Sequence, residues 1–132
     1  MKKVIHISGK RKKAIAKATL TDGTGRVRVN GRLLENFEPE YAKQKIMEPF
    51  LLAGANFGNM DINVKVIGGG VTSQADAARL AVARVMVEHS PGLKNVFLEY
   101  DRTLLVADVR RKECSKPNRH GQARSKTQKS YR

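Results

Sequence analysis

Residues 61–86 read DINVKVIGGGVTSQADAARLAVARVM, and this stretch decides the fold. Apolar and polar side chains alternate over its first seven residues, which is the periodicity of a strand with one buried face. We therefore predict that Ile62, Val64 and Val66 point into the core. Gly68-Gly69-Gly70 then interrupts the alternation and predicts a turn between this strand and a helix.

The helix after the glycines is predicted to run to about His89, and Pro91-Gly92 ends it. Thr72 or Ser73 can cap its N-terminus, and the carboxylate of Asp76 lies early enough to favour the positive end of the helix. The helix is rich in small residues, which indicates close packing on a sheet.

The region upstream of this stretch also alternates, and it predicts a β-hairpin. Residues 14–21 carry the alternation first, and residues 26–29 (RVRV) resume it. Between them, residues 22–25 (DGTG) offer the positive φ values of a tight turn. Asn30-Gly31 marks a second turn directly after the hairpin.

Three shorter elements complete the expected fold. Pro39 suits the first turn of a helix that runs to about Met47, and Pro49 is expected to stop it. A short helix is expected over Leu93–Leu98, and Leu104–Val106 is expected to form a last edge strand. The predicted fold class is α+β, with mostly antiparallel strands and helices on one face.

The length and composition are those of a single domain without a membrane segment. The chain has 132 residues, and no stretch approaches the roughly 20 apolar residues of a transmembrane helix. The basic N-terminus lacks the apolar run of a secretory signal. The one cysteine, Cys114, cannot form an internal disulfide, which fits a reducing, cytoplasmic location.

The net charge of +14 is concentrated at the two ends of the chain. Residues 1–17 carry +7 and residues 110–132 carry +8, while the residues between them sum to −1. Such an excess repels itself in a compact monomer, so a polyanionic partner is expected. Nucleic acid is the first candidate and an anionic membrane surface the second. We divide the chain into a globular body, residues 1–109, and a basic tail, residues 110–132.

Most of the tail is too polar to fold alone. Residues 115–132 contain one aromatic residue, one alanine and no branched aliphatic residue, so burial cannot offset the ordering entropy. We expect this segment to be disordered in the free protein and to thread between phosphates when bound. A solubilising tail is the alternative.

No motif in the sequence indicates catalysis, a metal or a cofactor. The triple glycine before a helix can cradle phosphate on backbone N–H groups, but the Lys-Ser/Thr of a nucleotide P-loop does not follow. A flexible turn explains the same glycines. Cys114 and His120 have no second pair nearby for zinc, and no Ser/His/Asp set or paired carboxylates stand out.

Several motifs resemble one protein family over nearly the whole chain. The segments that carry the resemblance, in order, are Gly9–Ala16, Gly25–Gly31, Gly68–Arg79, Asp108–Lys112 and Gln128–Arg132. Together they resemble the family of the ninth protein of the small ribosomal subunit. The Tyr131-Arg132 ending, where bacterial members typically have Lys-Arg, is similar to the archaeal and eukaryotic branch.

The resemblance implies a fold and a function. The fold would be a two-layer α+β sandwich with a left-handed β-α-β crossover, like the second domain of the fifth small-subunit protein, plus an extended basic C-terminal tail. The body would bind rRNA in the head of the small subunit, beside neighbouring head proteins. The tail would reach the anticodon stem-loop of the peptidyl-site tRNA. The protein would be a structural component of the ribosome and not an enzyme.

The expected contacts follow from the cations and glycines in these motifs and from the other cations of the tail. The rRNA contacts are expected from Lys10, Arg11, Lys12, Lys13, Gly69, Gly70, Arg79, Arg110, Arg111, Lys112, Arg119, Arg124 and Lys126. The tRNA contacts are expected from Lys129, Tyr131 and Arg132. Two alternatives stay open: a small-molecule kinase of the same fold class, and a free basic RNA-binding protein or RNA chaperone.

Overall fold

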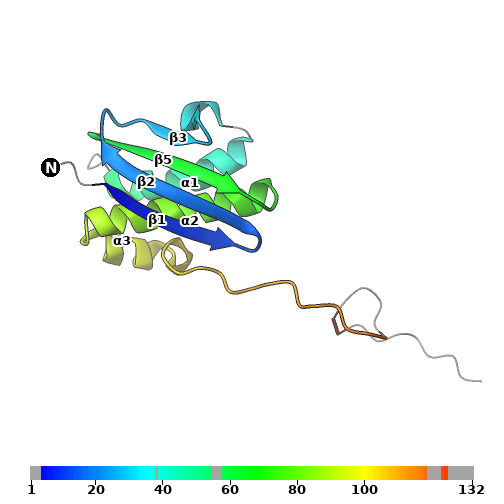
Figure 1. Ribbon diagram of the computed structural model, residues 1–132. Helices are drawn as coiled ribbons and strands as arrows, with labels where there is room; N and C mark the ends of the chain where they lie inside the picture. The colour runs from blue at the N-terminus through cyan, green and yellow to red at the C-terminus, as the bar shows by residue number, and fades with distance from the viewer. Residues whose placement is uncertain (1–3, 38, 55–57, 119–122, 125–132) are drawn as a thin grey trace, which may run out of the picture.

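The computed structural model describes residues 4–37, 39–54, 58–118 and 123–124. Its strands are β1 (Ile5–Arg11), β2 (Ala14–Asp22), β3 (Val27–Val29), β4 (Arg32–Leu33) and β5 (Met60–Ile67). Its helices are α1 (Glu40–Ala53), α2 (Val71–His89) and α3 (Leu93–Tyr100), with short 3-10 turns η1 (Leu34–Asn36) and η3 (Arg102–Leu104). The strands form one sheet in the order β1-β2-β5-β3-β4, and the helices lie behind it (Figure 1). The α+β class is confirmed.

The core lies between the sheet and α2, and small residues bring the two layers close. Ile62, Val64 and Val66 are buried as predicted, and the inner face of β2 is three alanines followed by Leu20. On β1, a Cβ added at Gly9 would lie 2.8 Å from the carbonyl oxygen of Ala77 in α2. The predicted close packing of the helix on the sheet is confirmed.

The predicted hairpin over residues 14–29 is wrong, because β5 lies between β2 and β3. β2 pairs antiparallel with β1 and β5, and β3 runs parallel to β5. The turn residues have another use: the backbone N–H groups of Thr24 and Arg26 donate to Asp61 Oδ1 at the start of β5. A Cβ at Gly23 would clash with the same carboxylate, so the glycine allows close approach rather than a tight turn.

The true hairpins are β1–β2 and β3–β4. The first turns at Lys12-Lys13, with φ of 53° at Lys12. The second turns at Asn30-Gly31, with φ of 52° and 83°, and this turn is confirmed. The Asn30 side chain extends the parallel pairing beyond β3, because its Oδ1 accepts from Val66 N–H at 2.8 Å and its Nδ2 donates to Val66 O at 3.3 Å.

The connection from β3 through α1 to β5 is a left-handed crossover, as the family resemblance implied. Figure 1 shows the strands in front of the helices, with β3 above β5; the β5 arrow points to the right and β3 is parallel to it. The usual right-handed rule assumes that a twisted strand feeds directly into the helix. Here β4 and η1 intervene and return the chain before α1 begins.

α1 does not stop at Pro49, which lies inside the helix. An internal proline costs about 3 kcal/mol locally, since it lacks an N–H and its ring crowds the preceding turn. Ala42, Ile46, Pro49 and Ala53 form one buried stripe at helical spacing. Burial of this stripe against α2 outweighs the local cost, so the helix continues for another turn.

The start of α2 also differs from the prediction. Gly70 is the N-cap, no side chain caps the helix, and no acidic residue lies in its first turn. Asp76 instead accepts from Lys45 Nζ at 3.1 Å, because the α1 cation is within reach. Val71, rather than a residue after Thr72 or Ser73, begins the helix because the extended Gly70 already ends the turn.

The last elements precede the tail. α3 is confirmed and extends to Tyr100. Leu104–Val106 is not a strand: the Asp101 carboxylate accepts from Thr103 N–H and starts the η3 turn, which buries Leu104. Residues 107–118 have no helix or strand and run away from the sheet as an extended segment (Figure 1). Within the described residues, no helix has the length and apolarity to cross a bilayer.

Candidate nucleic-acid interface

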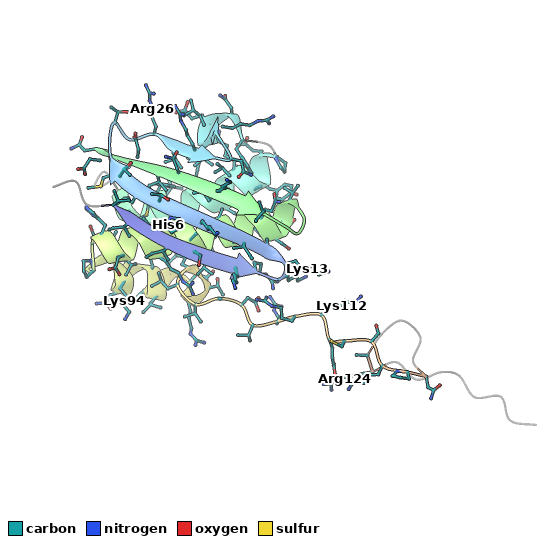
Figure 2. The ribbon with its side chains drawn as sticks, in the orientation of Figure 1. His6, Lys13, Arg26, Lys94, Lys112 and Arg124 are labelled. Carbon is teal, nitrogen blue, oxygen red and sulfur yellow. The ribbon has the colours of Figure 1, made fainter. Side chains whose placement is uncertain are left out.

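Three segments that are far apart in the sequence meet around one cavity of about 670 Å³. They are the β1–β2 turn, the glycine turn with the start of α2, and the start of the tail. Figure 2 shows Lys13 and Lys112 at the same end of the molecule, where the tail leaves the body. We call this cavity the basic groove; its lining residues are Arg11, Lys12, Lys13, Gly69, Gly70, Ser73, Arg110, Arg111 and Lys112. Eight of these nine are residues that the sequence predicts to contact rRNA.

The glycine turn is pressed against the β1–β2 turn. Gly68 and Gly69 have φ of 81° and 68°, a region that favours glycine. A Cβ at Gly68 would lie 2.5 Å from the carbonyl oxygen of Lys13, so no larger residue fits there. These two glycines therefore have a structural reason, since they fix the distance between the two turns.

At Gly70, by contrast, neither the backbone conformation nor the packing requires a glycine. Its backbone is extended, and a Cβ there would meet no atom within 4 Å. It caps α2 without a side chain, so the first backbone N–H groups of the helix are left for an outside acceptor. The positive end of a helix dipole and free N–H groups are a common site for phosphate. The open space at Gly70 gives such a group access.

Arg11 fastens the start of the tail to the body. Its guanidinium lies 3.5 Å from Asp108 and 3.8 Å from Asp76, and its side chain is only 16% exposed. Asp108 in turn accepts from Arg110 Nη2 at 2.7 Å. Hydrogen bonds from Arg110 to its carboxylate, with a smaller contribution from Arg11, hold the pKa of Asp108 far below its usual value. The tail thus leaves the body at a fixed point, beside the groove.

The charges of the other groove cations are available to a ligand, although Arg111 Nη1 also donates to the carbonyl oxygens of Asp108 and Arg110. In the described part of the chain, no carboxylate lies within ion-pair distance of Lys12, Lys13, Arg111 or Lys112. These side chains project from two segments toward one space. Their charge is therefore not neutralised within the described protein, and a phosphate group entering the groove would neutralise it.

Two predicted rRNA contacts lie outside the groove. Lys10 and Arg79 line a smaller cavity of about 160 Å³ beside it. Arg79 donates from Nε to Glu48 at 2.8 Å and from Nη2 to Asp101 at 3.3 Å, and its side chain is 12% exposed. Its guanidinium thus joins α2 to α1 and to η3, and its charge is already compensated. A contact between Arg79 and rRNA stays a prediction.

The remaining predicted residues lie in the tail. Arg124 is 86% exposed and donates to Glu113 at 2.9 Å. The other five lie outside the described residues; they are Arg119, Lys126, Lys129, Tyr131 and Arg132.

Sequence reasoning missed Asp108 as the anchor of the tail. An acid two residues before three consecutive cations, in the run Asp108-Val109-Arg110-Arg111-Lys112, was the available signal. It also missed Ser73 as a groove residue, because it assigned Ser73 to the cap of α2.

A two-layer α+β body with unpaired cations around an open helix end, continued by a basic tail, defines a polyanion-binding protein. Among the described residues, no group of His, Cys, Asp and Glu side chains could hold a metal ion. The basic groove offers charge and backbone donors but no nucleophile beside a base.

The family model for ribosomal protein S9/S16 matches residues 9–132. Curated relatives named small ribosomal subunit protein uS9 are similar over nearly the whole chain. That of Methanococcus vannielii is 50% identical and that of Halobacterium salinarum 49%, each alignment covering 98% of this chain and 99% of the relative. The chain belongs to the ribosomal protein S9/S16 family, and the resemblance seen in the sequence is confirmed. It is a ribosomal structural protein and not an enzyme, which removes the small-molecule kinase alternative.

Proposed function

We propose that the chain is a component of the small ribosomal subunit and binds rRNA through the basic groove. The relatives bear the name of a small-subunit protein. The single observation that carries the rRNA site is the groove itself, where unpaired cations from separate segments surround the open N-terminus of α2. Residues 1–109 form the rRNA-binding body, and residues 110–132 form the tail.

Binding at the groove would combine two kinds of contact. The N–H groups at the start of α2 donate to the oxygens of one phosphate, and the absence of a side chain at Gly70 lets the RNA backbone approach. Lys12, Lys13 and Lys112 then neutralise neighbouring phosphates as flexible point charges. These contacts are independent of base identity, so they position the protein on a shaped RNA rather than read a sequence.

The second part of the proposal concerns the end of the tail. Family resemblance assigns contact with the peptidyl-site tRNA to Lys129, Tyr131 and Arg132. The described part of the tail supports this direction, because it leaves the body at Asp108 and continues away from the sheet (Figure 1). An arginine can donate two parallel hydrogen bonds to a phosphate.

Replacing Gly70 tests the groove without damaging the fold. Gly70→Asp supplies a favoured N-cap in open space, so the free energy of unfolding should stay equal or rise by about 0.5 kcal/mol. The new carboxylate would occupy the helix N–H groups and repel a phosphate. Binding to small-subunit rRNA should weaken by roughly 10- to 100-fold, the equivalent of one charged hydrogen bond of about 1.5–3 kcal/mol.

Asn95→Asp is the matched control. It adds the same charge at an exposed position of α3, at the other end of the body from Lys13, as the neighbouring Lys94 in Figure 2 indicates. Equal rRNA affinity of the two variants would refute the groove as the binding site. Sucrose-gradient sedimentation separates the remaining alternative, because a free RNA chaperone would not co-sediment with small subunits.

A further inference from the structure

The sheet has a second face, which no described element covers. The helices pack on the inner face, and the outer face is presented to the viewer in Figure 1, with His6 labelled on it in Figure 2. Strand alternation places exposed Lys17, Asn63 and Lys65 on this outer face, together with Arg28 of β3. We call it the open face.

Two lysines stand directly opposite each other on the open face. In the antiparallel register of β2 and β5, Lys17 pairs with Lys65. Side chains at such positions start about 4.5–5.5 Å apart, and like charges there destabilise the sheet. Arg28 of β3 adds a third cation. Its register partner on the parallel strand β5 is Asn63, two residues before Lys65. In the free protein, this arrangement has an unfavourable energy without a compensating anion.

The described protein does not supply that anion. No carboxylate lies within ion-pair distance of Lys17, Lys65 or Arg28 in the described residues. Asp61 is the acid of β5 on this face, and its carboxylate accepts from the N–H groups of Arg26 and Thr24. The N–H of Arg26 contributes most to lowering the pKa of Asp61, which keeps this carboxylate ionised and committed to the turn.

The three cations surround a shallow cavity rather than a flat surface. The cavity measures about 500 Å³ and is bounded on one side by the β3–β4 turn at Asn30-Gly31. Its lining includes polar groups besides the cations: His6, whose Nδ1 lies 2.8 Å from Thr19 Oγ1, and Asn63. No Phe, Tyr or Trp lines it, so only the His6 ring and the Arg28 guanidinium plane could stack on a base. Its cations and polar groups fit the phosphates and sugar hydroxyls of an RNA backbone.

We propose that the open face is a second RNA-binding site, which takes the phosphate backbone of an rRNA strand on Lys17, Lys65 and Arg28. The inference rests on the proposed rRNA-binding function, but it uses different residues from the basic groove. The protein would then contact rRNA on two surfaces: at the end where the tail leaves, and across the sheet. The proposal also explains why Lys17 and Lys65 face each other, because a bound phosphate would offset the repulsion between their charges.

Three double variants test the proposal at constant loss of charge. Lys17→Gln with Lys65→Gln removes the open-face pair, and Lys12→Gln with Lys13→Gln removes the groove pair. Lys94→Gln with Arg102→Gln is the control, because both residues are exposed and lie on α3 and η3, on the helix side. The affinity of each for small-subunit rRNA is measured between 50 and 200 mM salt.

Each phosphate contact contributes about 0.7–0.9 to the slope of log K against log salt. Loss of the open-face pair should therefore lower the magnitude of this slope by about 1.4–1.8. The ratio of wild-type affinity to variant affinity should then fall about tenfold as the salt rises from 50 to 200 mM. If the open-face pair behaves like the control, the proposal is overturned. If the groove pair alone behaves like the control, the groove assignment fails and the open face stands. If the wild-type protein does not bind rRNA at all, both fail.

A second pair of measurements separates RNA from a neighbouring protein. Lys65→Gln alone should raise the thermal midpoint of the free protein while weakening rRNA binding, because it removes the repulsion between the facing lysines. Lys17 and Lys65 should also be protected from acetylation in a complex with deproteinised rRNA. Protection that occurs only in the complete subunit would assign the face to a protein neighbour and refute the proposal.

Discussion

Replacing Asn30 should destabilise the fold more than a turn residue normally does. β3 ends at Val29, so no backbone group of this strand reaches Val66 of β5. The Asn30 side chain takes the place of the missing strand residue, with one hydrogen bond to the N–H of Val66 and one to its carbonyl oxygen. Both bonds are partly buried, so water replaces them only in part.

The size of the effect follows from these contacts. Asn30→Gly keeps the positive φ of 52° accessible and removes both bonds, at about 0.5–1.5 kcal/mol each, for a loss of about 1–3 kcal/mol. Asn30→Ala should lose about 1 kcal/mol more, because alanine disfavours the left-handed region. Asn30→Asp keeps the acceptor for Val66 N–H, but its second carboxylate oxygen faces the carbonyl oxygen of Val66. We therefore expect Asn30→Asp to be little more stable than Asn30→Gly.

Urea unfolding followed by far-UV circular dichroism measures these losses, since the chain has no tryptophan to report by fluorescence. The midpoint should fall in the order wild type, Gly, Ala, with unchanged m-values. A Gly variant within about 0.5 kcal/mol of wild type would refute the account, because this is the scatter of ordinary surface substitutions. It would mean that Val66 finds other partners and that the side chain does not extend the sheet.

Three further outcomes are expected. Gly9→Ala should cost about 1–3 kcal/mol in thermal unfolding, because its Cβ would overlap the backbone of α2; an unchanged melting curve would contradict the close packing. Arg110→Gln should raise the pKa of Asp108 toward its usual value of 3.8, measured by carboxyl NMR titration; because the folded pKa is lowered, the stability that ionised Asp108 contributes through Arg110 is present above about pH 3.8 and is lost as the pH falls through that lowered pKa. Deletion of residues 131–132 should leave rRNA binding intact and weaken tRNA binding at the peptidyl site by about 1.5–3 kcal/mol, measured as the tRNA affinity of reconstituted subunits. If the subunits no longer assemble, these residues have a structural role instead.

Local patterns predicted the elements well, and they failed where distant segments decide the structure. The alternation of residues 61–67 identified a strand and its buried face correctly. The glycines after β2 suggested a hairpin, yet Gly23 approaches the Asp61 side chain and Gly25 approaches the backbone of Gly58, both far away in sequence. Pro49 is tolerated because α2 buries the stripe on which it lies. Neither reason is visible within a short window of sequence.

In the candidate site, too, local composition predicted the separate segments but not the contacts between them. Each of the three segments of the basic groove was predicted by its own composition, but their meeting depends on the β1–β2 hairpin and on the Arg11–Asp108 contact. Arg79 has the same residue type as the groove arginines, and only the folded chain shows that Glu48 and Asp101 compensate its charge. The facing lysines of the open face follow from a strand register that alternation alone does not fix.

The distribution of ion pairs links folding to binding. Within the described residues, the body carboxylates compensate cations that join elements, such as Arg11 and Arg79. Lysines on the groove and on the open face have no such partner, and their repulsion opposes the folded state in the free protein. An anionic ligand that binds only the folded form removes this repulsion and adds its binding free energy to stability. Acids such as Asp76 and Glu48 therefore join elements of the body, while the remaining positive charge would make the protein most stable with the RNA that we propose it binds.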